Sequence, residues 1–154
     1  GLQFNFSGNG FDGILFIEHD DTSTKSSQAR YNVLYNHSIY KTGYRYQGRA
    51  IGATWDNDSQ VTSLGAVGYL ANGDRLEVRA SYGELNVDSI DGVGSMHSIT
   101  THGSKFNSFV TKWQRPFLWG DIELEGRYTD QQIDQFGRQE DKLRAALTLN
   151  YKFD

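Results

Sequence analysis

The stretch LRAALTLNYKF, from Leu143 to Phe153, decides the fold class of this chain. Leucine, alanine, tyrosine and phenylalanine occupy its odd positions, and mostly polar residues occupy its even positions. A period of two is typical of a β-strand with one apolar face, whereas a helix would show a period near 3.6. The run is also about twice the usual strand length of ~5–6 residues. It therefore predicts a long strand with one apolar and one polar face.

The same alternation recurs upstream, where Asp121 to Tyr128 and Arg75 to Tyr82 carry one apolar and one charged face each. No stretch shows a capped helical period. Four weaker segments complete the pattern: Leu2 to Phe6, Gly13 to His19, Val61 to Leu70, and Lys105 to Trp113. The chain is predicted to be antiparallel all-β.

Connections of two lengths separate these segments. Asn72-Gly73 predicts a two-residue type I′ turn, which needs a positive φ at both residues. The short links are Asn9-Gly10, Asn72-Gly73 and Arg115 to Gly120, and the long polar loops are Asp20 to Ala29, Val87 to Gly103 and Gln131 to Glu140. Alternating strands would place the short links at one end of a sheet and the long loops at the other. The segment from Tyr31 to Asn57 is either two further strands or a long excursion, so seven to nine strands are expected.

Composition excludes several classes of protein. The hydrophobic fraction is 37%, and no apolar run approaches the ~20 residues of a transmembrane helix. A net charge of −4 argues against a nucleic-acid partner. One proline and 17 glycines suit long, curved β-ladders. A soluble ligand-binding barrel of lipocalin type and an outer-membrane barrel both fit strands of this kind.

Three features favour the membrane barrel: the long strands, the segregated loops, and a last strand that ends in Tyr151 and Phe153. That last strand resembles the signal by which bacterial outer-membrane proteins engage their assembly machinery. Trp113, Phe117, Trp119 and Tyr151 lie near short-turn ends, as expected of an aromatic girdle at the periplasmic interface. This reading implies outer-membrane lipid and lipopolysaccharide as partners.

One block has no simple strand pattern. HSIYKTGYRYQGRAIG, from His37 to Gly52, is dense in tyrosine, arginine and glycine; FIEHDD from Phe16 precedes it and ASYGELN from Ala80 follows. In this order the segments resemble the C-terminal part of the Wzi family of capsule assembly proteins. The resemblance implies an outer-membrane antiparallel β-barrel of about eighteen strands. It also implies a lectin-like protein that is not an enzyme and that anchors group 1-type capsular polysaccharide at the Gram-negative cell surface.

On this basis residues 1–154 are expected to form one C-terminal segment of such a barrel, as a natural fragment or a cropped domain. The complete barrel is expected to be monomeric and to need no cofactor. A free-standing eight-stranded barrel for adhesion or envelope structure is the alternative within the outer membrane.

A polysaccharide site needs aromatic rings for sugar faces and polar side chains for hydroxyl groups, and bidentate arginine suits uronic acids. Those groups concentrate in one segment, which supplies the predicted binding residues: Tyr40, Tyr44, Arg45, Tyr46, Arg49, Trp55, Asp56 and Asp58. The competing interpretation is a structural plug that packs the barrel lumen. Both can hold if the tip of the plug faces the capsule.

No catalytic or metal site is predicted. In Glu18-His19-Asp20-Asp21 only Glu18 and Asp20 share a face, and His97 and His102 lack the spacing of a zinc motif. The Ser–His neighbours at 37–38 and 97–98 cannot act as nucleophile and base, because adjacent residues of a strand point apart. A last set of charges is expected to pair across neighbouring strands for structural reasons: Arg75, Glu77, Arg79, Glu123, Glu125, Arg127 and Arg144.

Overall fold

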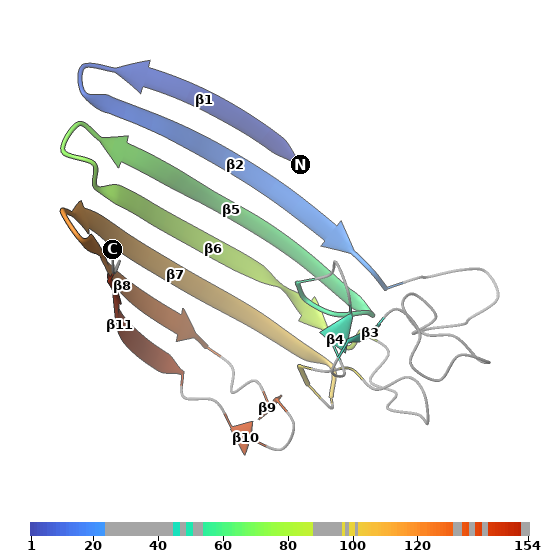
Figure 1. Cartoon of the computed structure of the whole chain (residues 1–154). Coiled ribbons are helices and arrows are strands. Elements are labelled where there is room, and N and C mark those ends of the chain that lie inside the picture. Colours follow the sequence, from blue (N-terminus) through green and yellow to red (C-terminus); the bar gives the residue numbers. More distant parts are fainter. Residues whose placement is uncertain are drawn as a thin grey trace.

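The computed structural model is built on one antiparallel sheet of seven strands (Figure 1). It describes residues 1–23, 45–46, 49–50, 54–87, 97, 99–100, 102–130, 134–135, 138–139 and 142–151. The strand order is β1-β2-β5-β6-β7-β8-β11, so each sheet strand pairs with the next one along the chain. Their bounds are Leu2–Gly8, Phe11–Asp21, Ser59–Leu70, Arg75–Leu85, Ser104–Phe117, Gly120–Thr129 and Leu143–Tyr151.

All seven predicted strands are confirmed, and the segment left open by the sequence is an excursion. Strand β2 pairs directly with β5 from Asp21↔Gln60 to Phe11↔Leu70, which leaves no place in the sheet for two strands between them. The two-residue strands β3 (Arg45–Tyr46) and β4 (Arg49–Ala50) pair only with each other. Strands β9 (Asp134–Gln135) and β10 (Arg138–Gln139) form a similar small ladder.

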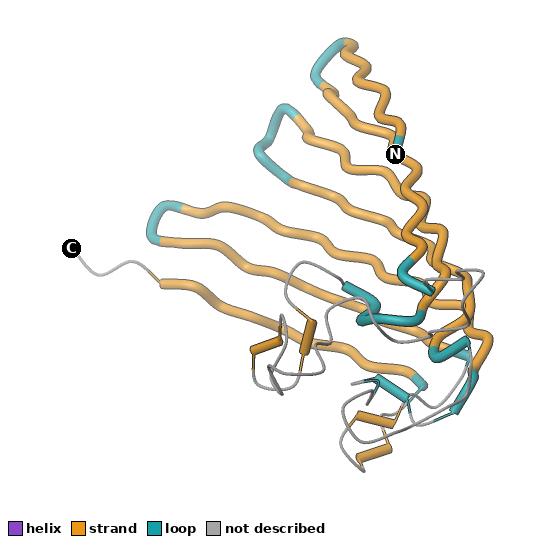
Figure 2. Tube along the Cα trace, turned by 90° about the vertical axis from the view of Figure 1, so that its right-hand side faces the viewer, coloured by secondary structure: helices purple, strands orange, loops and turns teal. Residues whose placement is uncertain are grey.

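The tight turns lie at one end of the sheet and the described loop residues at the other (Figure 2). The prediction of a two-residue type I′ turn at Asn72-Gly73 is wrong, because only Gly73 has a positive φ, of 86°. The connection spans residues 71–74 instead. Gly73 N–H donates to the Leu70 carbonyl at 2.9 Å, and the Asn72 side chain accepts from the Asp74 N–H at 3.0 Å. This side-chain bond stabilises the turn without a positive φ at asparagine.

The register gives the sheet two different faces. One face, which we call the apolar face, is formed by the odd-numbered residues of β2, β7 and β11 and by the even-numbered residues of β1, β5, β6 and β8. The opposite surface is the polar face. Large side chains on the apolar face remain exposed: Leu147 is 64% exposed, Leu64 49% and Leu124 45%. An apolar surface of this extent requires a covering partner or a lipid environment.

The two edge strands, β1 and β11, have no further partner among the described residues, so the sheet is open. The buried hydrophobic cluster is correspondingly small and lies at the loop end of the polar face. Within the described ranges, no helix is long and apolar enough to cross a membrane.

Candidate functional site

A small apolar cluster closes the loop end of the polar face. Val61 on β5, Leu85 on β6 and Phe106 on β7 are buried, and Ile99 and Trp55 pack against them from the loops. The rings of Trp55 and Phe106 lie 4.8 Å apart between centroids. We call these five residues the loop-end cluster. Through Trp55, this cluster packs the last part of the excursion, just before β5, against the sheet.

Gly83 permits the strands beneath this cluster to approach closely. It lies between Val61 and Phe106 in the register. A Cβ at this position would collide with the carbonyl oxygen of Gln60 on the neighbouring strand. The sequence alone shows only a glycine in a strand, whereas the structure shows why a side chain cannot occupy the position.

Three backbone hydrogen bonds tie the turn at 56–59 to the segments that follow β2 and β6. Thr22 N–H donates to the Ser59 carbonyl at 2.8 Å, Asp58 N–H donates to the Thr22 carbonyl at 3.1 Å, and Val87 N–H donates to the Asp58 carbonyl at 3.1 Å. The φ angles of Asp56, Asp58 and Asn86 are 67°, 50° and 52°. Aspartate and asparagine tolerate this left-handed region better than other side chains. Two of these residues lie in the turn and Asn86 directly follows β6, and the hydrogen bonds between the two segments hold this conformation.

Ser59 of this turn forms a buried pair with His97, which comes from the segment between β6 and β7, and the hydrogen bonds of the pair do not suit a nucleophile and its base. The backbone N–H groups of Ile99 and Thr100 both donate to Nδ1 of His97, each at 3.2 Å. Nδ1 therefore carries no proton, and in the neutral ring the proton is on Nε2, which donates to Ser59 Oγ at 3.0 Å. The Ser59 hydroxyl in turn donates to the Trp55 carbonyl at 2.8 Å. His97 has no lone pair directed at Ser59 and cannot act as its general base.

The structure covers part of the predicted polysaccharide site. Tyr40 and Tyr44 lie outside the described residues. The backbones of Arg45, Tyr46 and Arg49 form the β3–β4 ladder, with Tyr46 opposite Arg49.

The remaining three predicted residues lie in the turn at 54–58. Trp55 is half-buried against Phe106, while Asp56 is 2% and Asp58 0% exposed. These two carboxylates are shielded from solvent, and Oδ1 of Asp56 accepts a hydrogen bond from the Asn57 N–H at 2.9 Å.

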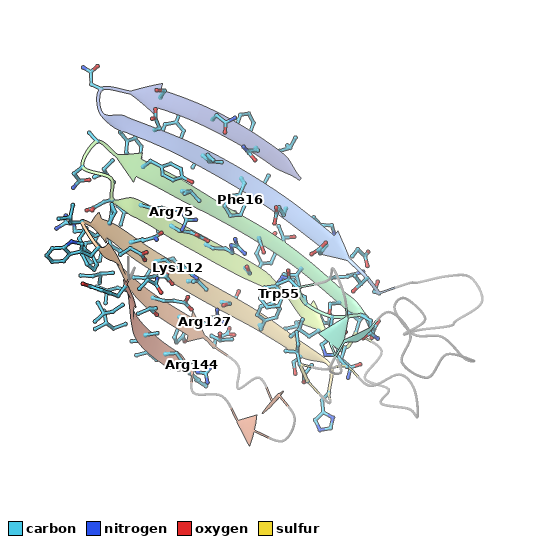
Figure 3. All side chains as sticks on the ribbon, viewed as in Figure 1. Phe16, Trp55, Arg75, Lys112, Arg127 and Arg144 are labelled. Atoms are coloured by element: carbon cyan, nitrogen blue, oxygen red, sulfur yellow. The ribbon has the colours of Figure 1, made fainter. Side chains whose placement is uncertain are left out.

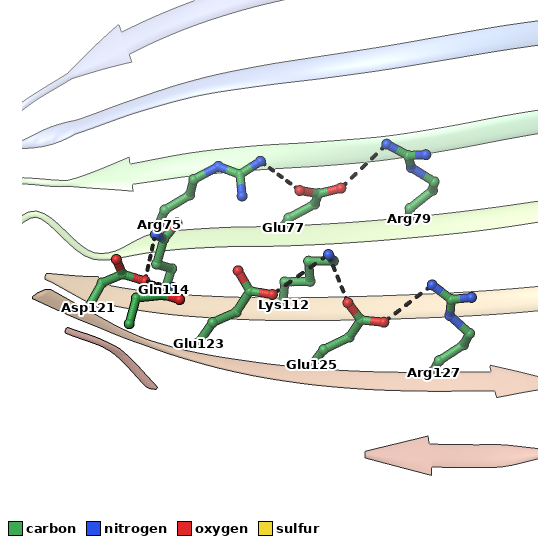
Figure 4. Close-up of polar contacts among 10 residues, drawn as sticks. Arg75, Glu77, Arg79, Lys112, Gln114, Asp121, Glu123, Glu125 and Arg127 are labelled. Atoms are coloured by element: carbon green, nitrogen blue, oxygen red, sulfur yellow. Dashed lines mark hydrogen bonds and ion pairs between the residues drawn. The ribbon is translucent and has the colours of Figure 1, made fainter. Parts of the chain in front are cut away.

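The charged side chains on the polar face form two rows of ion pairs (Figure 4). On β6, Glu77 contacts Arg75 at 2.6 Å and Arg79 at 3.4 Å. The second row lies on β7 and β8. There Lys112 contacts Glu125 at 2.7 Å and Glu123 at 3.8 Å, and Arg127 contacts Glu125 at 3.2 Å.

The rows differ in part from the expected cross-strand pairing. Several pairs join residues two apart on the same strand, and β7 separates β6 from β8. Lys112 was missed because the sequence of β7 alternates poorly. Figure 3 shows it on the same face as Arg75 and Arg127. The contact of Lys112 on β7 with the carboxylates of β8 is visible only once the strand order is known.

At the opposite end of the sheet, Asp74 anchors the β5–β6 turn to β7. Its carboxylate accepts two hydrogen bonds from Arg115 at 2.8 Å and one from the Trp113 indole at 3.2 Å. The Arg115 hydrogen bonds, followed by that of Trp113, lower the pKa of Asp74 to about 2. A lowered pKa means that this interaction stabilises the fold above the usual pKa near 3.8 and is lost as the pH falls towards 2.

The predicted aromatic residues at the short-turn end are all found there. Phe117 ends β7, Trp119 lies in the β7–β8 turn, and Tyr151 pairs with Gly120. Phe117, Trp119 and Tyr151 are between 40% and 56% exposed.

The residues described include no group of three or more His, Asp or Glu side chains that could hold a metal ion. His19 hydrogen-bonds Thr62 Oγ1 through Nδ1 at 2.9 Å on the apolar face. Glu18 and Asp20 share the polar face as expected, but the expectation that only these two share a face is wrong, because Asp21 lies on the apolar face with His19.

Comparison with known proteins identifies the family. The model of the family described as capsule assembly protein Wzi matches residues 2–147. The chain belongs to the Wzi family. Among curated proteins, no sequence matches it.

A solved Wzi structure has the same fold. It is described as an outer membrane protein involved in group 1 capsule assembly in Escherichia coli and as a carbohydrate-binding β-barrel. The two are 19% identical, with a TM-score of 0.78 over 98% of this chain. The chain spans 32% of the length of that protein. The open seven-stranded sheet of this Wzi family member therefore corresponds to a part of a β-barrel wall.

Proposed function

We propose that this chain forms a continuous strip of an outer-membrane barrel that binds capsular polysaccharide and anchors it at the cell surface. The observation that carries the proposal is the two-faced sheet, in which an exposed apolar face backs a polar face lined with ion pairs. This arrangement fits a barrel with lipid outside and water inside. Family membership and the carbohydrate-binding barrel of similar fold support it.

In this proposal the tight turns face the periplasm and the long loops face the outside, as in bacterial outer-membrane barrels. The exposed aromatic residues Phe117, Trp119 and Tyr151 then lie at the periplasmic interface. Residues 1–154 supply one segment of the wall, and the complete barrel acts as a monomer. Its partners are polysaccharide, outer-membrane lipid and lipopolysaccharide, and the assembly machinery.

The polysaccharide is bound by the excursion between β2 and β5. Tyr44, Arg45, Tyr46 and Arg49 supply stacking surface and bidentate donors, together with Tyr40. Because Asp56 and Asp58 are buried, we assign them, with Trp55, to supporting the excursion rather than to direct sugar contact.

The function is binding rather than catalysis. Support comes from the buried pair of Ser59 and His97, in which the histidine donates to the serine and cannot remove its proton.

The test is a variant in which Tyr44, Arg45, Tyr46 and Arg49 are all alanine. We expect it to fold, to reach the outer membrane and to release polysaccharide into the medium, because sugars bind through many shallow contacts that these residues provide. Folding is measured by heat-modifiable gel migration, and function by the ratio of cell-bound to free polysaccharide.

A matched control removes the same residue types elsewhere. Tyr69→Ala with Arg127→Ala changes a tyrosine and an arginine of the polar face below the loops and should leave the capsule in place. If the quadruple variant folds and keeps its capsule, the assignment of the binding site to the excursion is wrong. If it does not fold, the excursion is a structural plug.

A further inference from the structure

The excursion between β2 and β5 begins and ends at one place, where hydrogen bonds join its two ends. Thr22 Oγ1 accepts from the Ser59 N–H at 3.0 Å and donates to the Asp56 carbonyl at 2.9 Å. All three residues are buried, so these bonds are shielded from water. We call residues 22–23 and 55–59 the root of the excursion. The position of the excursion relative to the sheet depends on this root.

His97 joins the root to the next loop, which connects β6 with β7. Its Nε2 donates to Ser59 Oγ at 3.0 Å, and the Ser59 hydroxyl donates to the Trp55 carbonyl at 2.8 Å. The His97 side chain is buried. One histidine therefore holds together two segments that lie 38 residues apart in the sequence.

Only the neutral ring of His97 fits this site. Its Nδ1 accepts from the N–H groups of Ile99 and Thr100, each at 3.2 Å. A second proton would have to be carried by Nδ1, because Nε2 already carries one, and it would point at two N–H donors. The imidazolium ion has two donors and no acceptor. Protonation of His97 is therefore incompatible with these contacts and requires the ring to leave the site.

Three carboxylates belong to the elements that pack around His97: Asp20 on the polar face of β2, and Asp56 and Asp58 in the root. They attract an imidazolium ion through space, but the two N–H groups lie at hydrogen-bonding distance from Nδ1, so their repulsion is the nearer interaction. Aspartate ordinarily gains its proton near pH ~4 and imidazole near pH ~6.5, so a change between about pH 7.5 and about pH 5 reports on histidine. The other ionisable residues at these strand ends lie on the apolar face: Asp21, Glu84 and Lys105.

We propose that His97 is a positioning residue for polysaccharide binding, because its neutral ring holds the loop between β6 and β7 against the root of the excursion. The inference rests on the proposed function, which assigns the sugar contacts to the excursion. A proton binds to the released ring but not to the held ring, so acid favours release. Polysaccharide binding should therefore be strongest above pH ~6.5 and should weaken as the pH falls below that value.

Hydrogen exchange measures the release of His97 directly, because its ring protects the Ile99 and Thr100 amides. The experiment uses the full barrel protein in detergent micelles at about pH 7.5 and about pH 5. Protection factors of the two amides, corrected for the intrinsic exchange rate at each pH, should fall by up to ~30-fold. This factor follows because about 1.5 pH units below ~6.5 raise the ratio of released to held ring by that amount. Binding to purified capsular polysaccharide from the same bacterium should weaken by ~threefold or more, because only the held form is competent.

His97→Asn separates positioning by the neutral ring from other effects of pH. The asparagine amide oxygen can accept from the two N–H groups in place of Nδ1, but the side chain takes up no proton in this range. We expect this variant to bind polysaccharide at about pH 7.5 and to lose the pH dependence of both measurements. His102→Asn is the matched control, because this exposed histidine lies in the same loop, and it should respond to pH as the wild type does.

The inference is wrong if protection and binding in the wild type do not change with pH, if His97→Asn keeps the wild-type response, or if His102→Asn loses it. It is also wrong if His97 is released in acid while binding stays constant, because the histidine then has only a structural role. If His97→Asn does not fold, the wild-type measurements decide the question by themselves. A wild type that binds no polysaccharide at about pH 7.5 would instead contradict the proposed function.

Discussion

The orientation of the sheet can be tested on adjacent residues of β11. Leu147 is the fifth of nine residues in this strand, so about 13 Å of strand extends to either side of it. With a tilt of ~40° this is about 10 Å along the membrane normal, close to half of an apolar band ~25 Å tall. Leu147→Arg therefore places a charge near the midplane and should lower the free energy of unfolding by ~2–4 kcal/mol.

Thr148→Arg is the matched substitution on the polar face. Thr148 lies opposite Glu123, which has only a long contact of 3.8 Å to Lys112. A new arginine there gains a cross-strand partner, so stability should change by no more than ~1 kcal/mol. Both variants would be unfolded with urea from lipid vesicles and followed by tryptophan fluorescence. Equal stability losses, or a larger loss for Thr148→Arg, would refute the assignment of the apolar face to lipid.

Further predictions concern topology, packing and pH. An epitope tag inserted in the 87–103 loop should be labelled on intact cells, and a tag at Asn72–Gly73 should not be labelled. The reverse pattern would show that the barrel lies in the membrane with the opposite orientation. Gly83→Ala should destabilise the barrel by ~2 kcal/mol or more, because the new Cβ displaces the neighbouring strand. In Gly126→Ala the new Cβ meets only a methyl group at 3.4 Å, so the loss should be less than ~1 kcal/mol. Urea unfolding of the two variants compares these losses. Acidification from about pH 5 to pH 2 should lower the free energy of unfolding of the wild type more than that of Asp74→Asn, because the variant lacks the carboxylate whose pKa is lowered. An equal loss of stability in both proteins would contradict this prediction.

The period of two in the sequence determined the strands and their faces. Each strand alternates over ten or so residues, and a shift of one residue would exchange its two faces, so the pattern is strongly constrained. Alternation from Arg75 to Tyr82 and from Leu143 to Phe153 predicted the strands that the structure bounds at Arg75–Leu85 and Leu143–Tyr151. The separation of short turns from long loops was predicted as well. The His37 to Gly52 block pointed to the family through resemblance, which no periodicity provides.

The tertiary structure decided what depends on neighbours across the sheet. Strand pairing between β2 and β5 shows that the excursion adds no strand to the wall. The contact of Lys112 with the carboxylates of β8 follows from the strand order, and the burial of Asp58 follows from loop packing. Alternation specifies which way a side chain points, but not which side chain from another strand it meets. Those contacts join residues far apart in the chain, and only the folded register brings them together.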